Sequence, residues 1–387
     1  MKQSSKYIFA LLLALVAICS CRKDEYIIPS TSTQVSDGQD GEIKGFFLLN
    51  EGNMGSNKAT LDFYDYTTGI YHKNIYPERN PSIARELGDV GNDIKIWGDK
   101  LYAVINCSNF VEVMDVNTAE HITQISIPNC RYLAFKDGYA YVSSFAGPVS
   151  IDPTARLGYV AKIDTLTMSV VDECTVGYQP EQMAVVGDKL YVANSGGYMV
   201  PNYDNTVSVI DLNSFEVIKT IEVEVNLHCL ELDDYGYLWV SSRGDYYDIS
   251  SKTFVIDTQT DQVVNTLNLL PNSTMTLCGD SLYVYSSEWS YSTNSNTVNY
   301  AIVNTQNQQV VTRSFITDGS QANITEPYGL AVNPYTREIF ITDAKDYVTP
   351  GTVHCYSPEG NLKWSATTGD APAHIVFTNK ILQPLND

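Results

Sequence analysis

A strand pattern that recurs seven times constrains the fold of this chain more than any other feature. Each copy is a short apolar strand of the type Leu-Tyr-Val that ends in small polar residues. The aromatic positions are Phe47, Tyr102, Tyr141, Tyr191, Trp239, Tyr283 and Phe340. Four-stranded propeller blades repeat at about 40–50 residues, and these positions lie near that spacing. No sustained helical periodicity interrupts them, so the sequence predicts an all-β, seven-bladed β-propeller with four-stranded antiparallel blades.

The two ends of the chain carry a second sign of ring closure. The first blade lacks an innermost strand, because Gly45 opens directly on a second-strand sequence. Residues 371–377 (APAHIVF) resemble the innermost strands at 326–332 and 179–185. A C-terminal strand that pairs into the first blade would close the ring and protect its edges. We therefore predict one propeller domain over residues 45–381, followed by a short tail, 382–387.

The first residues are typical of an export signal. Lys2 and Lys6 precede an apolar stretch, Tyr7 to Ile18, that is too short to span a membrane. The sequence Ile18-Cys19-Ser20-Cys21 resembles a bacterial lipobox, so we expect residues 1–20 to be a signal peptide and Cys21 to be lipidated. An ordinary secretory signal is the alternative. Residues 21–44, rich in Ser, Thr, Asp and Gly, are predicted to be a flexible tether.

The chain is strongly acidic, with a formal net charge of −21 from 45 acidic and 24 basic residues. A surface of that sign repels the phosphate backbone of nucleic acids. The composition therefore argues against a nucleic-acid partner.

The predicted loops are unequal on the two faces of the ring. The turns between third and fourth strands are short, whereas loops between second and third strands are long. These long loops cover 50–58, 145–157, 194–205, 243–251, 287–296 and 343–351. The same face receives the first residues of the innermost strands, among them Asn92, Arg131, Gln182, His228, Thr274, Tyr328 and His374. Elaborated loops on a plain scaffold predict the functional face.

The strands Tyr191-Val192-Ala193-Asn194 and Phe340-Ile341-Thr342-Asp343, with residues 206–221 (TVSVIDLNSFEVIKTI), resemble YncE-like (YVTN-type) propellers. A lipoprotein signal, the Lys23-Asp24-Glu25 sequence typical of Bacteroidetes surface export, an acidic tether and a bare propeller together resemble BtuG-type surface lipoproteins. The resemblance implies a protein anchored to the outer membrane and facing the cell exterior. It also implies capture of cobalamin (vitamin B12) and delivery to a TonB-dependent transporter of the BtuB type.

The predicted binding residues on the loop face are aromatic or polar: Asn50, Asn92, Arg131, Phe145, Gln182, Asn194, Tyr198, Tyr203, His228, Arg243, Tyr246, Trp289, Tyr328 and His374. Aromatic walls suit the apolar macrocycle of a corrinoid, and amides and hydroxyls suit its edge. A glycan requires nearly the same residue types, so a glycan-binding or adhesion propeller remains an alternative.

Catalytic and metal-binding motifs are missing from the sequence. There is no HExxH, no metal-spaced Cys/His cluster and no nucleophile elbow. We therefore predict no catalytic residues, no metal and no covalently bound cofactor, and a lactonase-like or lyase-like enzyme is the least favoured alternative. Six cysteines follow the signal region: Cys107, Cys130, Cys174, Cys229, Cys278 and Cys355. Their pairing stays open, although Cys107 and Cys130 are expected on the same face.

Overall fold

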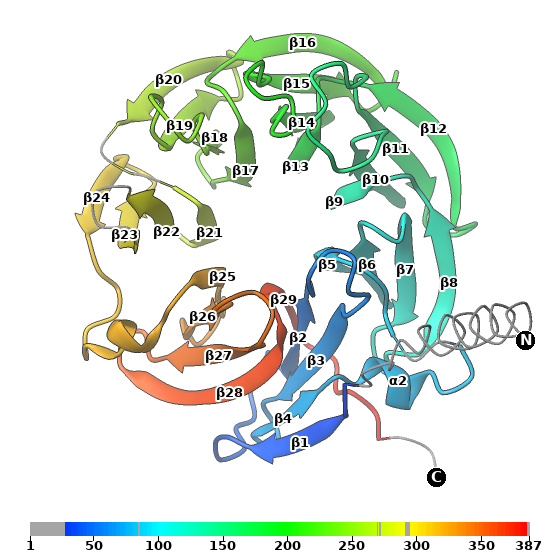
Figure 1. Ribbon diagram of the computed structural model, residues 1–387, viewed down its shortest axis with the longest axis vertical. Helices are drawn as coiled ribbons and strands as arrows, with labels where there is room; N and C mark the ends of the chain where they lie inside the picture. Colours follow the sequence, from blue (N-terminus) through cyan, green and yellow to red (C-terminus); the bar gives the residue numbers. More distant parts are fainter. Residues whose placement is uncertain (1–27, 84–85, 269, 271, 291–294, 385–387) are drawn as a thin grey trace, which may run out of the picture.

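Seven antiparallel sheets radiate from a common axis and close into a ring (Figure 1). The computed structural model describes residues 28–83, 86–268, 270, 272–290 and 295–384, without the side chains of 288–290 and 295–296. The predicted signal peptide, residues 1–20, and Cys21 lie outside the described residues. The predicted seven-bladed fold is confirmed.

Each blade is one sheet, and the blades follow one another along the chain. Blade 1 contains β1 (Thr31–Gln34), β2 (Gly45–Asn50), β3 (Thr60–Asp65), β4 (Ile70–Lys73) and β29 (Pro372–Thr378). Blade 2 contains β5 (Gly91–Trp97), β6 (Lys100–Ile105), β7 (Phe110–Asp115) and β8 (His121–Ser126). Blade 3 contains β9 (Cys130–Lys136), β10 (Tyr139–Ser144), β11 (Tyr159–Asp164) and β12 (Ser169–Thr175). Blade 4 contains β13 (Pro180–Val186), β14 (Lys189–Asn194), β15 (Thr206–Asp211) and β16 (Glu216–Glu222).

The remaining blades repeat this order from the axis outward. Blade 5 contains β17 (Leu227–Leu232), β18 (Tyr237–Ser242), β19 (Lys252–Asp257) and β20 (Gln262–Leu267). Blade 6 contains β21 (Thr274–Cys278), β22 (Ser281–Ser290), β23 (Ser295–Asn304) and β24 (Gln309–Thr312). Blade 7 contains β25 (Pro327–Val332), β26 (Ile339–Asp343), β27 (Pro350–Tyr356) and β28 (Leu362–Asp370). In the described chain, helix is limited to α2 (Tyr76–Arg79) and a 3-10 turn, η1 (Ser320–Asn323).

The second strand of each blade is the most deeply buried, which explains the repeat in the sequence. All six residues of β2 are buried, and the recurring aromatic Trp239 of β18 is fully buried. Apolar side chains from neighbouring blades pack on both faces of these strands, as Tyr102 of blade 2 does with Leu133 of blade 3. A strand buried on both faces carries consecutive apolar residues, whereas the outermost strand β16 is almost wholly exposed.

The ring closes through the C-terminal strand, as predicted. In Figure 1 the red β29 lies beside the blue β2, and the two strands pair in antiparallel register. Gly45 faces Thr378 and Leu48 faces Ile375 across this pair. Blade 1 is thus built from both ends of the domain, which leaves neither end as an open edge on the axis.

The predicted tether, residues 21–44, needs a correction. Residues 31–34 form β1, a fifth strand that pairs antiparallel with β4 on the outside of blade 1. All four side chains of β1 are exposed, so no apolar pattern in the sequence reveals the strand. Ile28 is buried, and the side-chain amide of Asn74 donates to its carbonyl at 2.8 Å. The chain is therefore already attached to the propeller at Ile28.

The predicted loop at 287–296 is also corrected. Strands β22 and β23 continue past the edge of the sheet, with Ser290 opposite Ser295. Trp289 accordingly lies in a strand, opposite Asn296. Ser, Thr and Asn dominate this segment, so it carries no apolar signal that distinguishes a projecting hairpin from a loop.

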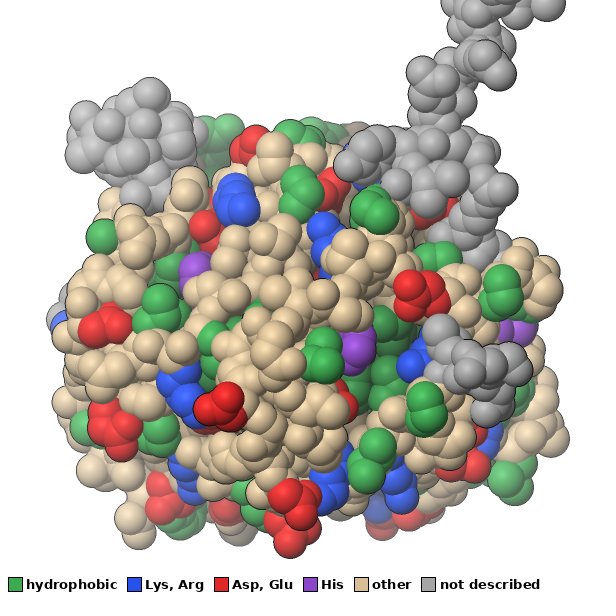
Figure 2. Space-filling model, turned by 90° about the horizontal axis from the view of Figure 1, so that it is seen from below, with side chains coloured by type: hydrophobic (Ala, Val, Ile, Leu, Met, Phe, Trp, Pro, Cys, Tyr) green, Lys and Arg blue, Asp and Glu red, His purple; other side chains and the backbone are tan. Residues whose placement is uncertain are grey.

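All six cysteines beyond the signal region are free thiols, so Cys107 and Cys130, which were expected on the same face, form no bridge. Five of the six are buried. In the side view of Figure 2, acidic, basic and apolar side chains are interspersed over the described surface. In the described part of the chain, no helix has the length and apolar character needed to cross a membrane.

Candidate functional site

A cavity of about 1280 Å³ lies on the axis of the ring and opens toward the long loops. Residues at the start of all seven innermost strands line it: Asn92, Arg131, Gln182, His228, Thr274, Tyr328 and His374. Met54, Tyr198, Tyr246, Tyr247 and Tyr347 contribute from the loops. The predicted functional face therefore contains a concave site.

Backbone bulges at the start of the innermost strands aim side chains into the cavity. Six of the seven pairs of first and second strands shift register there. In blade 3, Arg131 and Tyr132 together lie opposite the single residue Ser143. The extra residue breaks the ordinary alternation of the strand, so two consecutive side chains are redirected. Bulges therefore enlarge the number of side chains that each blade presents near the axis.

Hydroxyl groups at one repeat position stabilise these bulges. The Ser143 hydroxyl accepts from the backbone N–H of Tyr132 at 3.1 Å and donates to the carbonyl of Glu181 in the next blade at 2.8 Å. Thr342 accepts from the N–H of Gly329 at 2.6 Å and donates to the carbonyl of Pro372. A β-carbon at Gly329 would lie 2.3 Å from the carbonyl oxygen of Ala373, so this close approach of two blades requires glycine.

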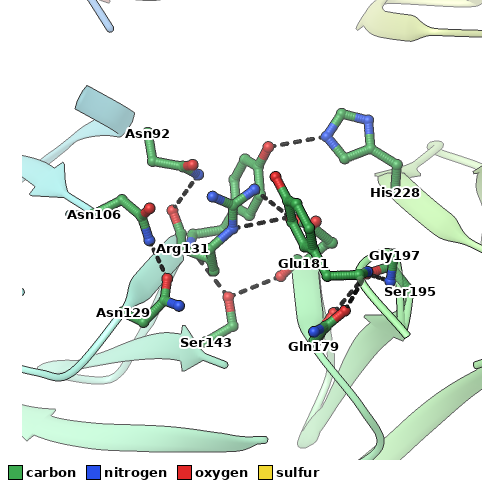
Figure 3. A network of polar contacts seen from close by, with 12 residues as sticks. Asn92, Asn106, Asn129, Arg131, Ser143, Gln179, Glu181, Ser195, Gly197 and His228 are labelled. Carbon is green, nitrogen blue, oxygen red and sulfur yellow. Dashed lines mark hydrogen bonds and ion pairs between the residues drawn. The ribbon is translucent and has the colours of Figure 1, made fainter. Parts of the chain in front are cut away.

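One wall of the cavity holds a charged triad from three consecutive blades. Nε and Nη2 of Arg131 donate to Oε2 of Glu181 at 3.2 and 3.0 Å (Figure 3). On the other side of the carboxylate, Nη1 of Arg243 lies 3.7 Å from Oε1. The Arg131 guanidinium also lies over the ring of Phe145, 4.7 Å from its centre. Burial lowers the pKa of both guanidinium groups, but the Glu181 carboxylate and the nearby Tyr132 act in the opposite direction, and the pKa of each arginine is raised. Both arginines therefore stay charged.

A histidine beside this triad is held neutral. The hydroxyl of Tyr132 lies 2.9 Å from Nε2 of His228, and both side chains are buried. Burial, together with the positive charges of Arg243 and Arg131, lowers the pKa of His228 well below its usual value. An imidazole in this setting acts as a neutral hydrogen-bonding group at physiological pH.

The opposite wall combines tyrosines with carboxylates. The Tyr328 hydroxyl donates to Oε2 of Glu51 at 2.6 Å, and Nε2 of His374 lies 3.3 Å from Oε1 of the same carboxylate. The ring of Tyr347 packs edge-on against Tyr328, with ring centres 5.4 Å apart. Burial and nearby carboxylates raise the pKa of both tyrosines, Glu51 at Tyr328 and Glu326 at Tyr347. These phenols therefore stay protonated and can donate hydrogen bonds.

Between these two walls lies a neutral stretch from blades 5 and 6. Asn272, Ser273, Thr274 and Ser287 line it. Asn272 is fully buried, and among the described residues its Oδ1 has no hydrogen-bond partner. Its amide nitrogen contacts Thr253 Oγ1 at 3.1 Å, which fixes the side chain. The neutral wall thus holds a buried acceptor that has no partner among the described residues.

Most of the predicted site residues line this cavity. Those that do are Asn92, Arg131, Gln182, Tyr198, His228, Arg243, Tyr246, Tyr328 and His374. Gln182 also accepts the backbone N–H of Leu230 at 3.0 Å through Oε1, so part of its bonding capacity is structural.

The other predicted residues have different positions. Asn50 and Asn194 are fully buried, and their amides donate to Oγ1 of Thr60 and of Thr206, both at 3.0 Å. They cap the ends of β2 and β14 instead of facing the cavity. Phe145 is buried beneath Arg131, and the Tyr203 hydroxyl contacts the carbonyl of Asp245 at 3.4 Å. The side chain of Trp289 is not among those that the structure describes.

Several cavity residues were not predicted from the sequence, above all Glu181, Tyr132 and Glu51. Glu181 directly follows Pro180, just as the predicted residue Tyr328 directly follows Pro327. An alignment of the innermost strands on these prolines would therefore have selected Glu181. Tyr132 follows Arg131, where ordinary strand alternation directs only one of two neighbours inward. The bulge makes both contribute, and no sequence signal marks it.

In the described chain, no group of three or more His, Cys, Asp or Glu side chains is placed to hold a metal ion. The Glu51 carboxylate is hydrogen-bonded to His374, and the Glu181 carboxylate is hydrogen-bonded to Arg131. The site therefore offers guanidinium, phenol, imidazole and amide groups for hydrogen bonding, with aromatic rings at its mouth.

Comparison with known proteins relates this geometry to a family. The sequence model of a domain of unknown function (DUF5074) matches residues 44–377. A search of curated protein sequences finds no significant match.

Solved structures share the fold at low sequence identity. A quinoprotein alcohol dehydrogenase-like protein from Bacteroides thetaiotaomicron is 15% identical, with a TM-score of 0.56, over 88% of this chain and 79% of that chain. A functionally unknown protein from Desulfotomaculum acetoxidans is 10% identical, with a TM-score of 0.57, over 86% of this chain and 98% of that one. Hydrazine synthase from Kuenenia stuttgartiensis is 16% identical, with a TM-score of 0.56, over 70% of this chain and 77% of that chain. At these identities the likeness establishes the fold alone.

Proposed function

Because this chain belongs to the DUF5074 family and carries a large axial cavity, we propose that it is a binding protein for a corrinoid, cobalamin, and not an enzyme. The size of the cavity carries the proposal. Pockets for ordinary small molecules measure roughly 300–1,000 Å³, and the axial cavity, at about 1280 Å³, exceeds that range. A ligand that fills it is larger than a typical metabolite.

The distribution of side chains around the cavity supports the same ligand. A corrinoid has a broad apolar macrocycle that is edged with amides and carries a nucleotide tail. Tyrosines at the mouth, such as Tyr198 and Tyr246, supply apolar faces with polar tips. Gln182, Ser273 and Thr274, which are partly exposed, supply amide and hydroxyl groups that pair with the amide edge. A preformed ring of this kind binds without a large ordering cost.

The cellular setting belongs to the same proposal. Lipidation at Cys21 would hold the propeller at the outer membrane, with the cavity directed toward the medium. Release of the ligand to a TonB-dependent transporter of the BtuB type would then follow docking of the propeller on that transporter. These steps rest on the lipobox and on the resemblance to BtuG-type lipoproteins.

A glycan is the second candidate, and one observation favours it. Tyr246 and Tyr247 are 60% and 79% exposed at the mouth of the cavity. Exposed rings of this kind stack on sugar faces as readily as on a macrocycle. A glycan would therefore bind at the mouth of the cavity, whereas a corrinoid would fill the cavity itself.

Titration of the purified chain with cyanocobalamin, followed by calorimetry and by the visible absorbance of the corrin, tests the proposal. We expect one corrinoid per chain and a dissociation constant of about 1 μM or lower, which corresponds to about −8 kcal/mol. Absence of binding at micromolar concentration would remove the corrinoid proposal. A glycan array probed with the same preparation then tests the second candidate.

A further inference from the structure

The charged triad of Arg131, Glu181 and Arg243 has more positive than negative charge. Glu181 is 2% exposed, and both of its carboxylate oxygens already face an arginine. Two guanidinium groups against one carboxylate leave one positive charge uncompensated. A charge buried in a protein costs free energy unless it is paired. The triad therefore carries an excess positive charge, on the partly exposed Arg243, that a further anion can neutralise.

Arg243 has the capacity to bind that anion. Its side chain is 32% exposed, compared with 13% for Arg131, and both residues line the cavity. Within the described residues, the Arg243 guanidinium makes the ion pair with Glu181 at 3.7 Å and no closer polar contact. Its N–H groups are thus available to a ligand. A guanidinium fork suits the paired oxygens of a phosphate or carboxylate group.

The triad is fixed in place before any ligand arrives. Arg131 packs on the ring of Phe145, and its carbonyl accepts from the Asn92 amide at 2.7 Å. Ser143 ties the adjacent backbone to the carbonyl of Glu181. Rigid donors that need no reorganisation bind an anion more strongly than mobile surface arginines do.

The charges on the other walls of the cavity determine how an anionic ligand is oriented. The opposite wall carries Glu51 and Glu326, and Glu326 has other contacts of its own. An anionic group is repelled by that wall and attracted by the triad. A ligand with one negative end would therefore bind with that end toward blades 3 to 5.

We propose that Arg131 and Arg243 form an anion subsite that takes the singly charged phosphodiester of the ligand. The inference rests on the proposed function for the identity of the ligand, since the phosphodiester of cobalamin lies in its nucleotide tail. The macrocycle then occupies the wider part of the cavity, toward the neutral wall and the tyrosines at the mouth.

The test compares two corrinoids on matched variants. Cyanocobalamin carries the phosphodiester, and dicyanocobinamide lacks the nucleotide tail and its phosphate. Arg243→Gln removes the charge from the subsite, and Arg313→Gln removes an exposed arginine that does not line the cavity. Charge-assisted hydrogen bonds are worth about 1.5–3 kcal/mol, so we expect Arg243→Gln to weaken cyanocobalamin binding at least about tenfold. Its effect on dicyanocobinamide, and the effect of Arg313→Gln on either corrinoid, should stay below about twofold.

The responses of the two corrinoids to Arg243→Gln decide whether the anion subsite exists. Equal weakening of both corrinoids by Arg243→Gln, or no weakening of either, overturns the anion subsite while cobalamin binding by the wild type stands. If Arg243→Gln fails to fold, Arg243→Lys replaces it. Lysine keeps the charge but loses the planar fork, so a selective loss for cyanocobalamin is again expected.

If the wild type binds neither corrinoid, the proposed function fails and the subsite is tested alone. The probe is then dimethyl phosphate at millimolar concentration, with sodium chloride at equal ionic strength as the control. We expect dimethyl phosphate to raise the melting temperature of the wild type and of Arg313→Gln, but not of Arg243→Gln. An equal response of all three proteins overturns the subsite.

Discussion

At the scale of single residues, the repeat positions differ in what they do. Ser143, Ser241 and Thr342 occupy one position of the second strand, and each accepts a backbone N–H that a bulge has released. Such a hydrogen bond contributes about 1 kcal/mol, and its loss leaves a buried donor unpaired. These hydroxyl groups of the second strand therefore stabilise the backbone near the axis.

Glu231 supports a prediction about pH. It lines the cavity on β17, and burial raises the pKa of its carboxyl group to about 7, although the positive charge of Lys95 works in the opposite direction. The ordinary pKa of a glutamate is about 4.3. Between that pH and about 7, the carboxyl group of Glu231 keeps its proton in the folded state but has lost it in the unfolded state. The contribution of Glu231 to the free energy of unfolding is therefore fully present below pH about 4.3 and is lost as the pH rises through about 7.

We therefore expect Glu231→Gln to become more stable relative to wild type as the pH rises from 4.5 to 7.5. Urea unfolding at several pH values measures this difference. Glu222→Gln, at an exposed position on the outer strand β16, serves as the control and should follow the wild-type profile. Parallel pH profiles for Glu231→Gln and wild type would show that the carboxyl group does not retain its proton.

At the scale of elements, two terminal strands complete blade 1 in different ways. Strand β29 is the innermost strand and inserts Ile375 and Phe377 against the core formed with blade 7. Strand β1 is the outermost and adds backbone pairing and a few exposed side-chain hydrogen bonds, such as Ser32 to His72, but no apolar burial. Apolar burial contributes about 25 cal/mol per Å², so β29 contributes far more to stability than β1.

Truncation after Asp370 removes β29 and tests this difference. We expect the truncated chain to lose its cooperative melting transition, because β2 then exposes an unpaired edge and an apolar face. A chain that ends at Pro384 keeps β29 and the contacts of Leu382 and Gln383, and should melt close to wild type. Circular dichroism on heating measures both, and equal melting curves would mean that the ring does not depend on its closing strand.

At the scale of the whole molecule, the net charge of −21 acts against the compact ring. Ion pairs on the described surface, such as Lys100–Asp99, are exposed and contribute about 0–1 kcal/mol each. Repulsion among 45 acidic groups extends over the whole molecule at low salt. We conclude that the net repulsion outweighs the surface pairs.

Added salt should therefore stabilise this protein. The Debye length falls from about 30 Å at 0.01 M to about 10 Å at 0.1 M salt, which screens long-range repulsion more than short contacts. We expect the melting temperature to rise by at least about 2 °C over that range. Scanning calorimetry in sodium chloride and in sodium perchlorate separates screening from ion-specific effects. A fall in melting temperature in both salts would show that the surface ion pairs dominate.

The fold was predictable in detail because it depends on a local, repeated pattern. Strands that are buried on both faces must be continuously apolar, and that requirement recurs in each blade. The site was less predictable. Nine predicted residues line the cavity, but Asn50 and Asn194 cap strands, because an amide at a strand end looks the same in sequence whether it faces solvent or a neighbour. Tyr132 was missed because a bulge changes which side chains of its strand face the axis.

The sequence by itself determined the number of blades, the closing strand and the face that carries the long loops. Each of these follows from burial of apolar residues, which the order of residues along the chain records directly. Only the tertiary structure decided that Arg131, Glu181 and Arg243 meet on one wall, that His228 stays neutral and that β1 joins blade 1. Those outcomes depend on distances between residues of different blades, or on backbone pairing without an apolar pattern, and neither leaves a periodic signal in the chain.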